Sequence, residues 1–348
     1  MSKPVELRAA EQPGVSVVII CRNGASRLPR TLAYLQKQCV PSWLAWEVIL
    51  VDNASTDGTA EVAKKVWQHA PTATLRIVRE ERIGATFARE RSLGVARYEI
   101  VTFVDDDNWI CDRWVQRVFD VMTEHPEVGA CGGFSTVETE AALPPWFERY
   151  KNYYAVGPSL DESGDVTETI GMLWGAGMTI RRSGWQQLTQ RGFRFLTKLT
   201  GEDQELSLAL RLSGWRLWLD PELTMQHFMP SARLSWAYFC ELQRSRSDIL
   251  VDADPYFFAL RADKSDGLRQ AEFTWTSQIV SVLRLLIVNA VRRPAKTFFP
   301  MSPRFEGDSD VLRIVSYKGR LRGLIRCRRD YAANVREVVE ASWLSSRP

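Results

Sequence analysis

Acidic side chains follow two β-rich segments of this chain at the points where those segments end. Asp52 comes directly after residues 47–51, and three aspartates, Asp105–Asp107, follow residues 100–104. The carboxyl ends of parallel strands meet at one edge of a sheet, so we expect these carboxylates to share a crevice. Neighbouring desolvated carboxylates need a cation or hydrogen-bond donors. A divalent metal ion bound by one or two of them and by substrate phosphates would meet that need.

Each of these acidic groups also has a simpler interpretation. Asp105 or Asp107 could cap the following helix from a solvated loop. Glu202 and Asp203 open a predicted helix, where the helix dipole stabilises negative charge, but acids in a first helical turn are also a common helix-start signal. His227 stands alone, and a lone histidine often serves only as a structural hydrogen-bonding group.

The segments that must position these residues alternate between strand and helix over the first 135 residues. Apolar, β-rich runs predict strands, and apolar residues at helical spacing predict the helices between them. The expected strands are Val15–Ile20, Glu47–Val51, Leu75–Val78 and Ile100–Val104. This order predicts an α/β fold with a Rossmann-like, mostly parallel sheet flanked by helices.

The composition changes after Pro144, where aromatic residues and glycines become dense. We expect a loop-rich extension that builds a pocket wall, with Trp146, Tyr150, Tyr153 and Tyr154 as candidates to line a groove. Alternatively, these aromatic residues belong to the core, as most of the 13 tryptophans must. Beyond Ser235 the pattern is mainly helical and increasingly basic. Residues 1–260 hold 28 basic and 33 acidic side chains, whereas residues 261–348 hold 17 basic and 9 acidic ones. The predicted division is therefore residues 1–235 and a C-terminal helical, basic region, residues 236–348.

Composition excludes several classes of protein. With 348 residues and a net charge of +3, the chain can bury a sizeable core and is too nearly neutral for a general nucleic-acid binder. Its six scattered cysteines fit buried hydrophobic side chains in a reducing cytoplasm. The polar N-terminus predicts no signal peptide. The longest apolar stretch, Ile279–Val291, is interrupted by Arg284 and Asn289 and is too short to span a bilayer.

Four motifs in the order of the chain resemble those of family 2 glycosyltransferases with the GT-A fold. They cover roughly the first 235 residues, and several spaced motifs are more specific than any one. The motifs are residues 17–24 (VVIICRNG), 51–59 (VDNASTDGT), 103–107 (FVDDD) and 201–203 (GED). Within this family the chain is most similar to glycosyltransferases of the bacterial exopolysaccharide and hormogonium-polysaccharide type.

The resemblance implies roles for single residues. The nucleotide-sugar donor would be bound by Arg22, Asn23, Asp52, Arg89, Asp105 and Asp106. Glu90 stands where the family usually has an asparagine after the arginine, a departure from its pattern at Arg89. The run Asp105–Asp107 resembles the family's DXD motif, whose last acid binds the metal on the donor diphosphate.

The metal and the base follow from the same resemblance. Asp107 would bind the metal ion, and His227 would complete its coordination. The ion is expected to be Mn²⁺ or Mg²⁺, and an imidazole among oxygen ligands favours Mn²⁺. Asp203 would be the general base that takes the proton of an acceptor hydroxyl.

These features predict an inverting, metal-dependent glycosyltransferase that moves a sugar from a nucleotide-diphosphate donor to a glycan or lipid-linked acceptor in polysaccharide biosynthesis. The alternatives are a nucleotidyltransferase and a non-catalytic sugar-nucleotide-binding protein of the same fold. A nucleotidyltransferase would need a glycine-rich loop with a lysine after the first strand, and residues 21–30 contain neither. No G-x-G-x-x-G motif follows that strand, which argues against a dinucleotide oxidoreductase.

The basic C-terminal region has two interpretations. The segment Val282–Val288 and the arginines beyond it, including Arg292, Arg320, Arg326 and Arg329, suit an interfacial helix and a polybasic patch on an anionic membrane surface. Alternatively, the apolar face packs on the catalytic domain and the arginines are solvated. The expected location is the cytoplasm, including the inner face of the cell membrane.

Overall fold

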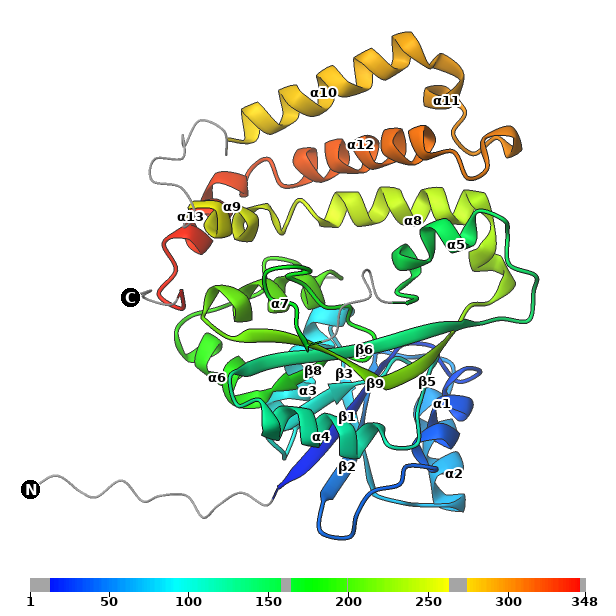
Figure 1. The fold of residues 1–348 in the computed structure, drawn as a ribbon, viewed down its shortest axis with the longest axis vertical. Helices are drawn as coiled ribbons and strands as arrows, with labels where there is room; N and C mark the ends of the chain where they lie inside the picture. Colours follow the sequence, from blue (N-terminus) through cyan, green and yellow to red (C-terminus); the bar gives the residue numbers. More distant parts are fainter. Residues whose placement is uncertain (1–12, 158–163, 199, 263–273, 345–348) are drawn as a thin grey trace, which may run out of the picture.

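The computed structural model describes residues 13–157, 164–198, 200–262 and 274–344. Residues 1–12, where the sequence predicts no signal peptide, lie outside the described residues, as do residues 263–273 of the predicted C-terminal region. The molecule is a mixed sheet with helices on both faces and a stack of further helices on one side (Figure 1).

Within the described residues, nine strands form one sheet in the order β3-β2-β1-β4-β8-β6-β9-β5, and β7 also pairs with β9. The strands, in the order of the chain, are β1 (Gly14–Cys21), β2 (Ala45–Asn53), β3 (Thr74–Glu80), β4 (Ile100–Phe103), β5 (Asn108–Ile110), β6 (Val128–Glu138), β7 (Gly164–Asp165), β8 (Thr179–Arg181) and β9 (Arg216–Phe228). The predicted strands correspond to β1–β4, and the α/β prediction is confirmed.

The first half of the sheet is parallel and the second half is mixed. β1 pairs in parallel with β2 and β4, and β2 with β3, so their carboxyl ends meet at one edge. β8 runs antiparallel to β4 and β6, and β5 runs antiparallel to β9. The register between β6 and β9 shifts around Gly133, where a Cβ atom would collide with the carbonyl oxygen of Leu223. Such a close approach requires glycine. The glycine interrupts the apolar alternation of β6, which is why apolar periodicity did not predict this strand.

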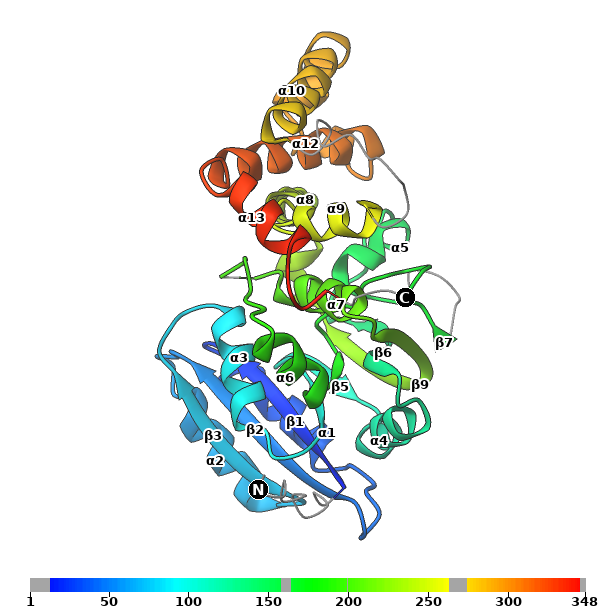
Figure 2. The ribbon, with the colours of Figure 1, turned by 90° about the vertical axis from the view of Figure 1, so that its left-hand side faces the viewer.

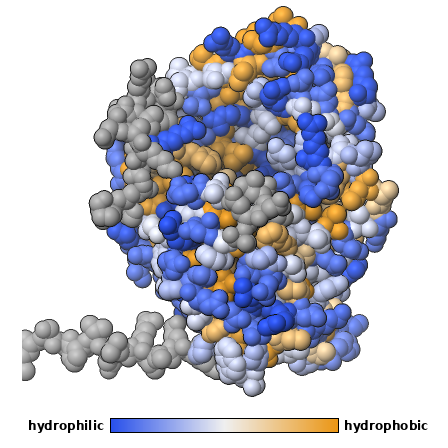
Figure 3. All heavy atoms as spheres, in the orientation of Figure 1, coloured by the Kyte–Doolittle hydropathy of each residue, from blue (hydrophilic) through white to orange (hydrophobic). Residues whose placement is uncertain are grey.

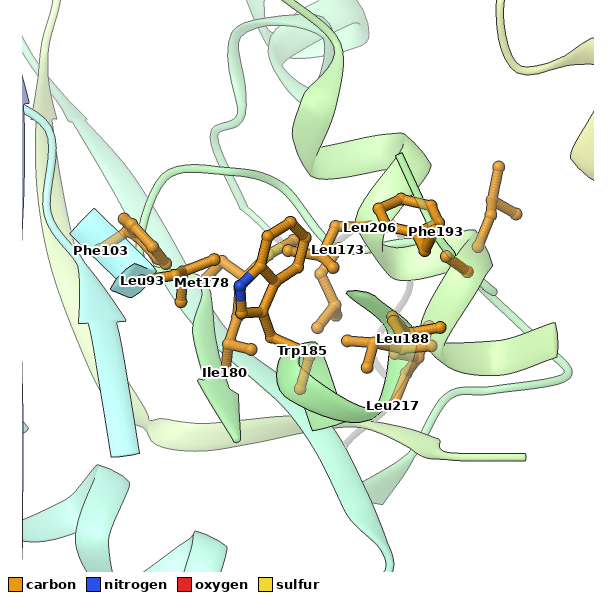
Figure 4. Packing of buried hydrophobic residues seen from close by; sticks show 14 of the residues in the cluster. Leu93, Phe103, Leu173, Met178, Ile180, Trp185, Leu188, Phe193, Leu206 and Leu217 are labelled. Carbon is orange, nitrogen blue, oxygen red and sulfur yellow. The ribbon is translucent and has the colours of Figure 1, made fainter. Parts of the chain in front are cut away.

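The two faces of the sheet carry separate hydrophobic cores. Alternate residues of β1 face opposite sides, with Val17 in one cluster and Val18 in the other. One cluster packs under α1 (Leu28–Leu35), α2 (Thr59–His69) and α4 (Trp114–Glu124). The other packs under α3 (Ala85–Val95), α6 (Arg182–Gln190) and α7 (Glu202–Leu212). Figure 4 shows Trp185 of α6 inserted among Ile180, Leu188 and Leu206 in this second cluster.

The C-terminal helices stack on the edge of the sheet where the acidic residues lie. They are α8 (Trp236–Ile249), α9 (Asp254–Ala262), α10 (Trp275–Arg292), α11 (Pro294–Phe298), α12 (Ser309–Arg326) and α13 (Tyr331–Val339). Two views show α8, α12 and α10 lying one above another in that order (Figures 1 and 2). Phe239 of α8 shares a core cluster with Phe147 of the short helix α5 (Phe147–Tyr150), and Tyr256 of α9 shares one with Leu206.

The packing corrects two expectations about individual side chains. Cys39 is exposed, so the prediction that the cysteines are buried hydrophobic residues is wrong at this position. Trp146 and Tyr150 lie in the core beside Phe239 and not in a groove. Tyr153 and Tyr154, by contrast, line the cleft described next.

Candidate functional site

A cleft of about 560 Å³ lies between the carboxyl edge of the sheet and the stacked helices. Many separate segments of the chain line it. They contribute Arg22 after β1, Asp105–Asp107 after β4, Asp203 at the start of α7, His227 near the end of β9 and Arg246 of α8. The parallel strands and α7 therefore bring together residues that are nearly 200 positions apart in the sequence.

The three consecutive aspartates have different surroundings. Arg27 binds both carboxylate oxygens of Asp106, with its Nε 3.1 Å and its Nη2 2.7 Å away, and the Cys21 thiol donates to the same carboxylate at 3.0 Å. Burial, and then the neighbouring Asp107, raise the pKa of Asp105 to about 7. Asp106 is thus neutralised by the protein itself, whereas Asp105 and Asp107 line the cleft with less compensation.

Asp107 and His227 lie side by side in the wall of the cleft. The histidine Nε2 lies 3.7 Å from Asp107 Oδ1, longer than a hydrogen bond, and Arg233 Nη1 lies 3.1 Å from the other carboxylate oxygen. Burial lowers the pKa of His227, which favours the neutral imidazole that binds metals. Pairing of β5 with β9, which aligns Asn108 with His227, places the ring beside the aspartates.

Carboxylate and imidazole are a donor set that fits a divalent ion such as Mn²⁺. No group of three His, Cys, Asp or Glu side chains suited to a metal is found in the part of the chain that the structure describes. Asp107 and His227 would therefore supply two ligands and leave other positions to substrate oxygens and water, as is usual for metals bound together with phosphates.

Asp203 lies at the N-terminal end of α7, where the helix favours a negative charge. Its Oδ2 accepts a hydrogen bond from the backbone N–H of Gly175 at 2.8 Å, and its Oδ1 accepts one from Gln204 N–H. A Cβ atom on Gly175 would lie 3.1 Å from that Oδ2, so a glycine at 175 gives the carboxylate room. The carboxylate is partly buried and lines the cleft beside Trp174.

Arg89 and Glu202 form a buried ion pair at the base of the cleft. Arg89 Nε and Nη2 lie 3.2 and 3.1 Å from Glu202 Oε1, and both side chains are nearly inaccessible to solvent. The guanidinium also stacks over Phe103, 4.1 Å from the ring centre. Arg89 Nη1 is buried and has no hydrogen-bond partner among the described residues. The Arg89 side chain also forms part of the lining of the cleft.

The Arg89–Glu202 pair leads to a stability prediction. We expect Arg89→Met to lower the free energy of unfolding by about 3–5 kcal/mol, because it leaves a buried carboxylate without its cation. The double variant Arg89→Met/Glu202→Gln should lose clearly less than the single variant. Urea denaturation of both variants measures this difference. Equal losses in the two variants would contradict a role for the pair in stability.

Asn23 and Asp52 do not line this cleft. The Asn23 side chain accepts a hydrogen bond from Thr56 N–H at 2.9 Å, which joins the loops after β1 and β2. Asp52 lies in a neighbouring hollow, bound by Arg79 at 2.7 Å and by Ser55 N–H at 2.9 Å. Burial opposes its ionisation, but these contacts outweigh burial and hold the pKa of Asp52 below its usual value. The roles assigned to these two residues remain predictions.

Sequence analysis missed three cationic side chains in the cleft: Arg27, Arg233 and Arg246. Arg27 and Arg233 bind Asp106 and Asp107. Arg246 donates to the backbone oxygen of Tyr153 at 3.0 Å. Arg233 follows His227 closely in the sequence, and this proximity is a local signal that could have identified it as a cleft residue. Nothing in the sequence pairs α8 with this edge of the sheet.

The family model named "Glycosyl transferase family 2" matches residues 16–188. The succinoglycan biosynthesis protein ExoM of Rhizobium meliloti is 24% identical over 331 residues, which cover 92% of this chain and 96% of ExoM. TuaG of Bacillus subtilis, a glycosyltransferase named for teichuronic acid biosynthesis, is 30% identical over 125 residues. That alignment covers 36% of this chain and 48% of TuaG, so it spans about half of the relative.

Two solved structures share the fold. The mannosyltransferase PcManGT from Pyrobaculum calidifontis, in complex with GDP-Man and Mn²⁺, superimposes with a TM-score of 0.55 at 18% identity. TarS 1–349 of S. aureus, in complex with UDP-GlcNAc, superimposes with a TM-score of 0.51 at 20% identity. Each comparison covers 94% of this chain and 90% of the other. At this level of identity the likeness extends to the fold, including the helical C-terminal region.

Proposed function

Residues 16–188 make this chain a family 2 glycosyltransferase, and we propose that it transfers a sugar from a nucleotide-diphosphate donor with inversion at the anomeric carbon and with the help of a divalent metal. The observation that carries the proposal is the gathering of Arg89, Asp105, Asp107, Asp203 and His227 around one cleft. Metal-binding groups, a base and a cationic donor are the parts that such a transfer needs.

The donor would lie along the carboxyl edge of β1 and β4. Arg22 is exposed there and would bind oxygen atoms of the nucleotide, and Arg89 lines the same cleft and would supply positive charge at its base. Asn23 and Asp52 connect and stiffen the loops on this side. We assign Asp105 to the ribose or the sugar, and Asp106 a supporting role through Arg27. This supporting role differs from the direct donor contact expected from the sequence.

Asp107 and His227 would hold the metal ion on the donor diphosphate. Mn²⁺ or Mg²⁺ bound there would act as a Lewis acid that neutralises charge developing on the leaving diphosphate. Arg233 binds the Asp107 carboxylate in this structure. A metal ion bound to that carboxylate would take over this charge compensation and leave the guanidinium free to bind the donor diphosphate. The structural neighbour PcManGT is in complex with GDP-Man and Mn²⁺, which supports the use of a divalent metal together with a nucleotide-sugar donor.

Asp203 would act as the general base. Its carboxylate would take the proton of an acceptor hydroxyl while that oxygen forms a bond to the anomeric carbon and the carbon–oxygen bond to the diphosphate breaks, with the electron pair leaving on the diphosphate. The Gly175 N–H and the start of α7 hold the carboxylate in place and favour its charged form. Attack from the face opposite the leaving group inverts the configuration.

The acceptor would approach past an aromatic wall formed by Tyr153, Trp174 and Tyr238. Aromatic rings stack on the apolar faces of sugars. We propose a glycan or a lipid-linked glycan as the acceptor, in polysaccharide biosynthesis. The names of ExoM and TuaG, which refer to succinoglycan and teichuronic acid, support this class of product.

Incubation of the purified chain with a panel of UDP- and GDP-sugars tests the proposal. We expect slow hydrolysis of one donor, dependent on Mn²⁺ or Mg²⁺ and abolished by EDTA, with release of a nucleoside diphosphate and a free sugar. Proton NMR of the first sugar released would report its anomeric configuration. Release of a nucleoside monophosphate together with a sugar 1-phosphate would show cleavage between the two phosphates and would indicate a nucleotidyltransferase instead. Donor binding with no turnover, even with candidate acceptors added, would indicate a binding protein.

A further inference from the structure

Helix α10 is attached to the molecule by one edge only. Val282, Ile279 and Leu286 pack in a cluster with Leu324 of α12, and the Trp275 indole N–H donates to the backbone oxygen of Leu324 at 2.6 Å. α12 in turn packs on α8, whose other side lines the cleft. α10 is thus the outermost layer of the stack, and its far side meets no other described element (Figures 1 and 2).

The outward side of α10 is apolar, the reverse of an ordinary surface helix. Val280, Leu283, Ile287 and Val291 recur at spacings of three and four and form one stripe, and Val291 is 77% exposed. Phe298, Phe299 and Met301, which follow α10 in the chain, are also exposed, and Phe299 is 67% exposed. We call these seven residues the α10 surface. Figure 3 shows hydrophobic side chains along the upper edge of the molecule, over α10.

The chain segment that carries the α10 surface has charged side chains of a single sign. Residues 275–305 contain five basic side chains and no acidic one. Arg293 and Lys296 are bound by Asp310. Arg284, Arg292 and Arg304 form no ion pair with any described residue, and Arg284 projects from the outward side itself. The apolar stripe therefore lies among cations that lack acidic partners.

The structure also separates these cations from the arginines of α12. Arg320 is bound by Asp254, and Arg326 by Asp248 and Asp252, so both serve to hold α12 against α8 and α9. Arg322 is likewise bound by Asp248. Three of the five arginines in the polybasic patch that the sequence predicts at residues 320–329 therefore make internal contacts, whereas Arg284 and Arg292 of α10 form no ion pair with a described residue.

We propose that the α10 surface binds an anionic lipid bilayer, with α10 lying in the plane of the interface. Apolar side chains would enter the acyl boundary while Arg284, Arg292 and Arg304 bind lipid phosphates. No described helix is long and apolar enough to cross a membrane, and interfacial binding does not require one. Pairing with a second copy through the same face is disfavoured because it would bring like charges together. The inference does not depend on the reaction proposed above.

Flotation of the full chain with lipid vesicles tests this proposal. We expect binding to vesicles of phosphatidylcholine mixed with phosphatidylglycerol, little binding to phosphatidylcholine alone, and weakening with salt. Arg284→Gln/Arg292→Gln should weaken binding about fivefold per arginine removed. Ile287→Ser/Val291→Ser should weaken it at least about tenfold through lost apolar burial. Trp43→Ser, which removes an exposed aromatic residue elsewhere, should bind as the unmodified chain does.

Two results would overturn the proposal. One is equal binding, or no binding, to both kinds of vesicle. The other is a dimer, seen by light scattering without lipid, that becomes monomeric in Ile287→Ser/Val291→Ser, since the face would then be an interface between copies. Circular dichroism of each variant checks that the exposed substitutions leave the fold intact, so a loss of binding reports on the surface.

Discussion

Asp203→Asn is expected to lower sugar transfer about 10²- to 10⁴-fold, the usual contribution of a general base, and to leave donor binding nearly unchanged. An asparagine has the same shape, and its side-chain oxygen can still accept the hydrogen bond from Gly175 N–H. It cannot take a proton from the acceptor. Turnover is measured with the donor found by the hydrolysis panel and a glycan acceptor, and donor affinity is measured by calorimetry.

The matched control for this prediction is Asp330→Asn. Asp330 is an exposed aspartate beside a helix start, and its side chain makes no capping hydrogen bond. It should keep full activity. Turnover of Asp203→Asn within a few fold of the unmodified enzyme would remove Asp203 from the mechanism. A parallel loss of donor affinity would instead make Asp203 a donor-binding residue.

Asp107→Ala is expected to abolish the dependence of donor binding on metal. Loss of residues that only orient metal ligands costs about 10- to 100-fold in affinity, so loss of a ligand should cost at least about 100-fold in the presence of Mn²⁺. The side chain also neutralises Arg233, and the variant leaves that guanidinium free to bind phosphate directly. We therefore expect some weak, metal-independent binding of the donor to persist.

Calorimetric titration of the donor with Mn²⁺ and with EDTA measures this effect. Asp112→Ala, at an exposed aspartate outside the cleft, should retain the difference between the two conditions. His227→Gln should reduce the difference without removing it, because the carboxylate remains. An unchanged donor affinity of Asp107→Ala in the presence of Mn²⁺ would contradict the assignment of Asp107 as a metal ligand. This result would not bear on the roles proposed for the general base and for the donor-binding residues.

Much of the framework could be predicted from local patterns. Apolar runs identify β1–β4, and the apolar stripe Trp114, Val115 and Val118 identifies α4. β6 and β9 were not predicted, because Gly133 and Pro221 interrupt their apolar pattern. The register of the pairing between the two strands also shifts, so their alternation is irregular. Such strands are specified by their partners more than by their own residues.

The candidate site was predicted in part. Motif spacing identified Arg89, Asp107 and Asp203, and the fold brings all three to one cleft. The same reasoning placed Asp52 with them, yet its carboxylate is bound by Arg79 in the adjacent hollow. The end of a strand fixes the backbone position of a residue, but the neighbouring cations determine the direction in which its carboxylate points.

The sequence alone therefore determined the order of strands and helices and the edge of the sheet that carries acidic residues, because both follow from periodicity over a few residues. The tertiary structure determined which charged side chains form ion pairs with each other. Arg89 meets Glu202 across 113 positions, and Arg233 meets Asp107 across 126. It also decided that the apolar stripe of α10 faces outward. Contacts at such separations depend on how whole elements pack, and no local pattern encodes that packing.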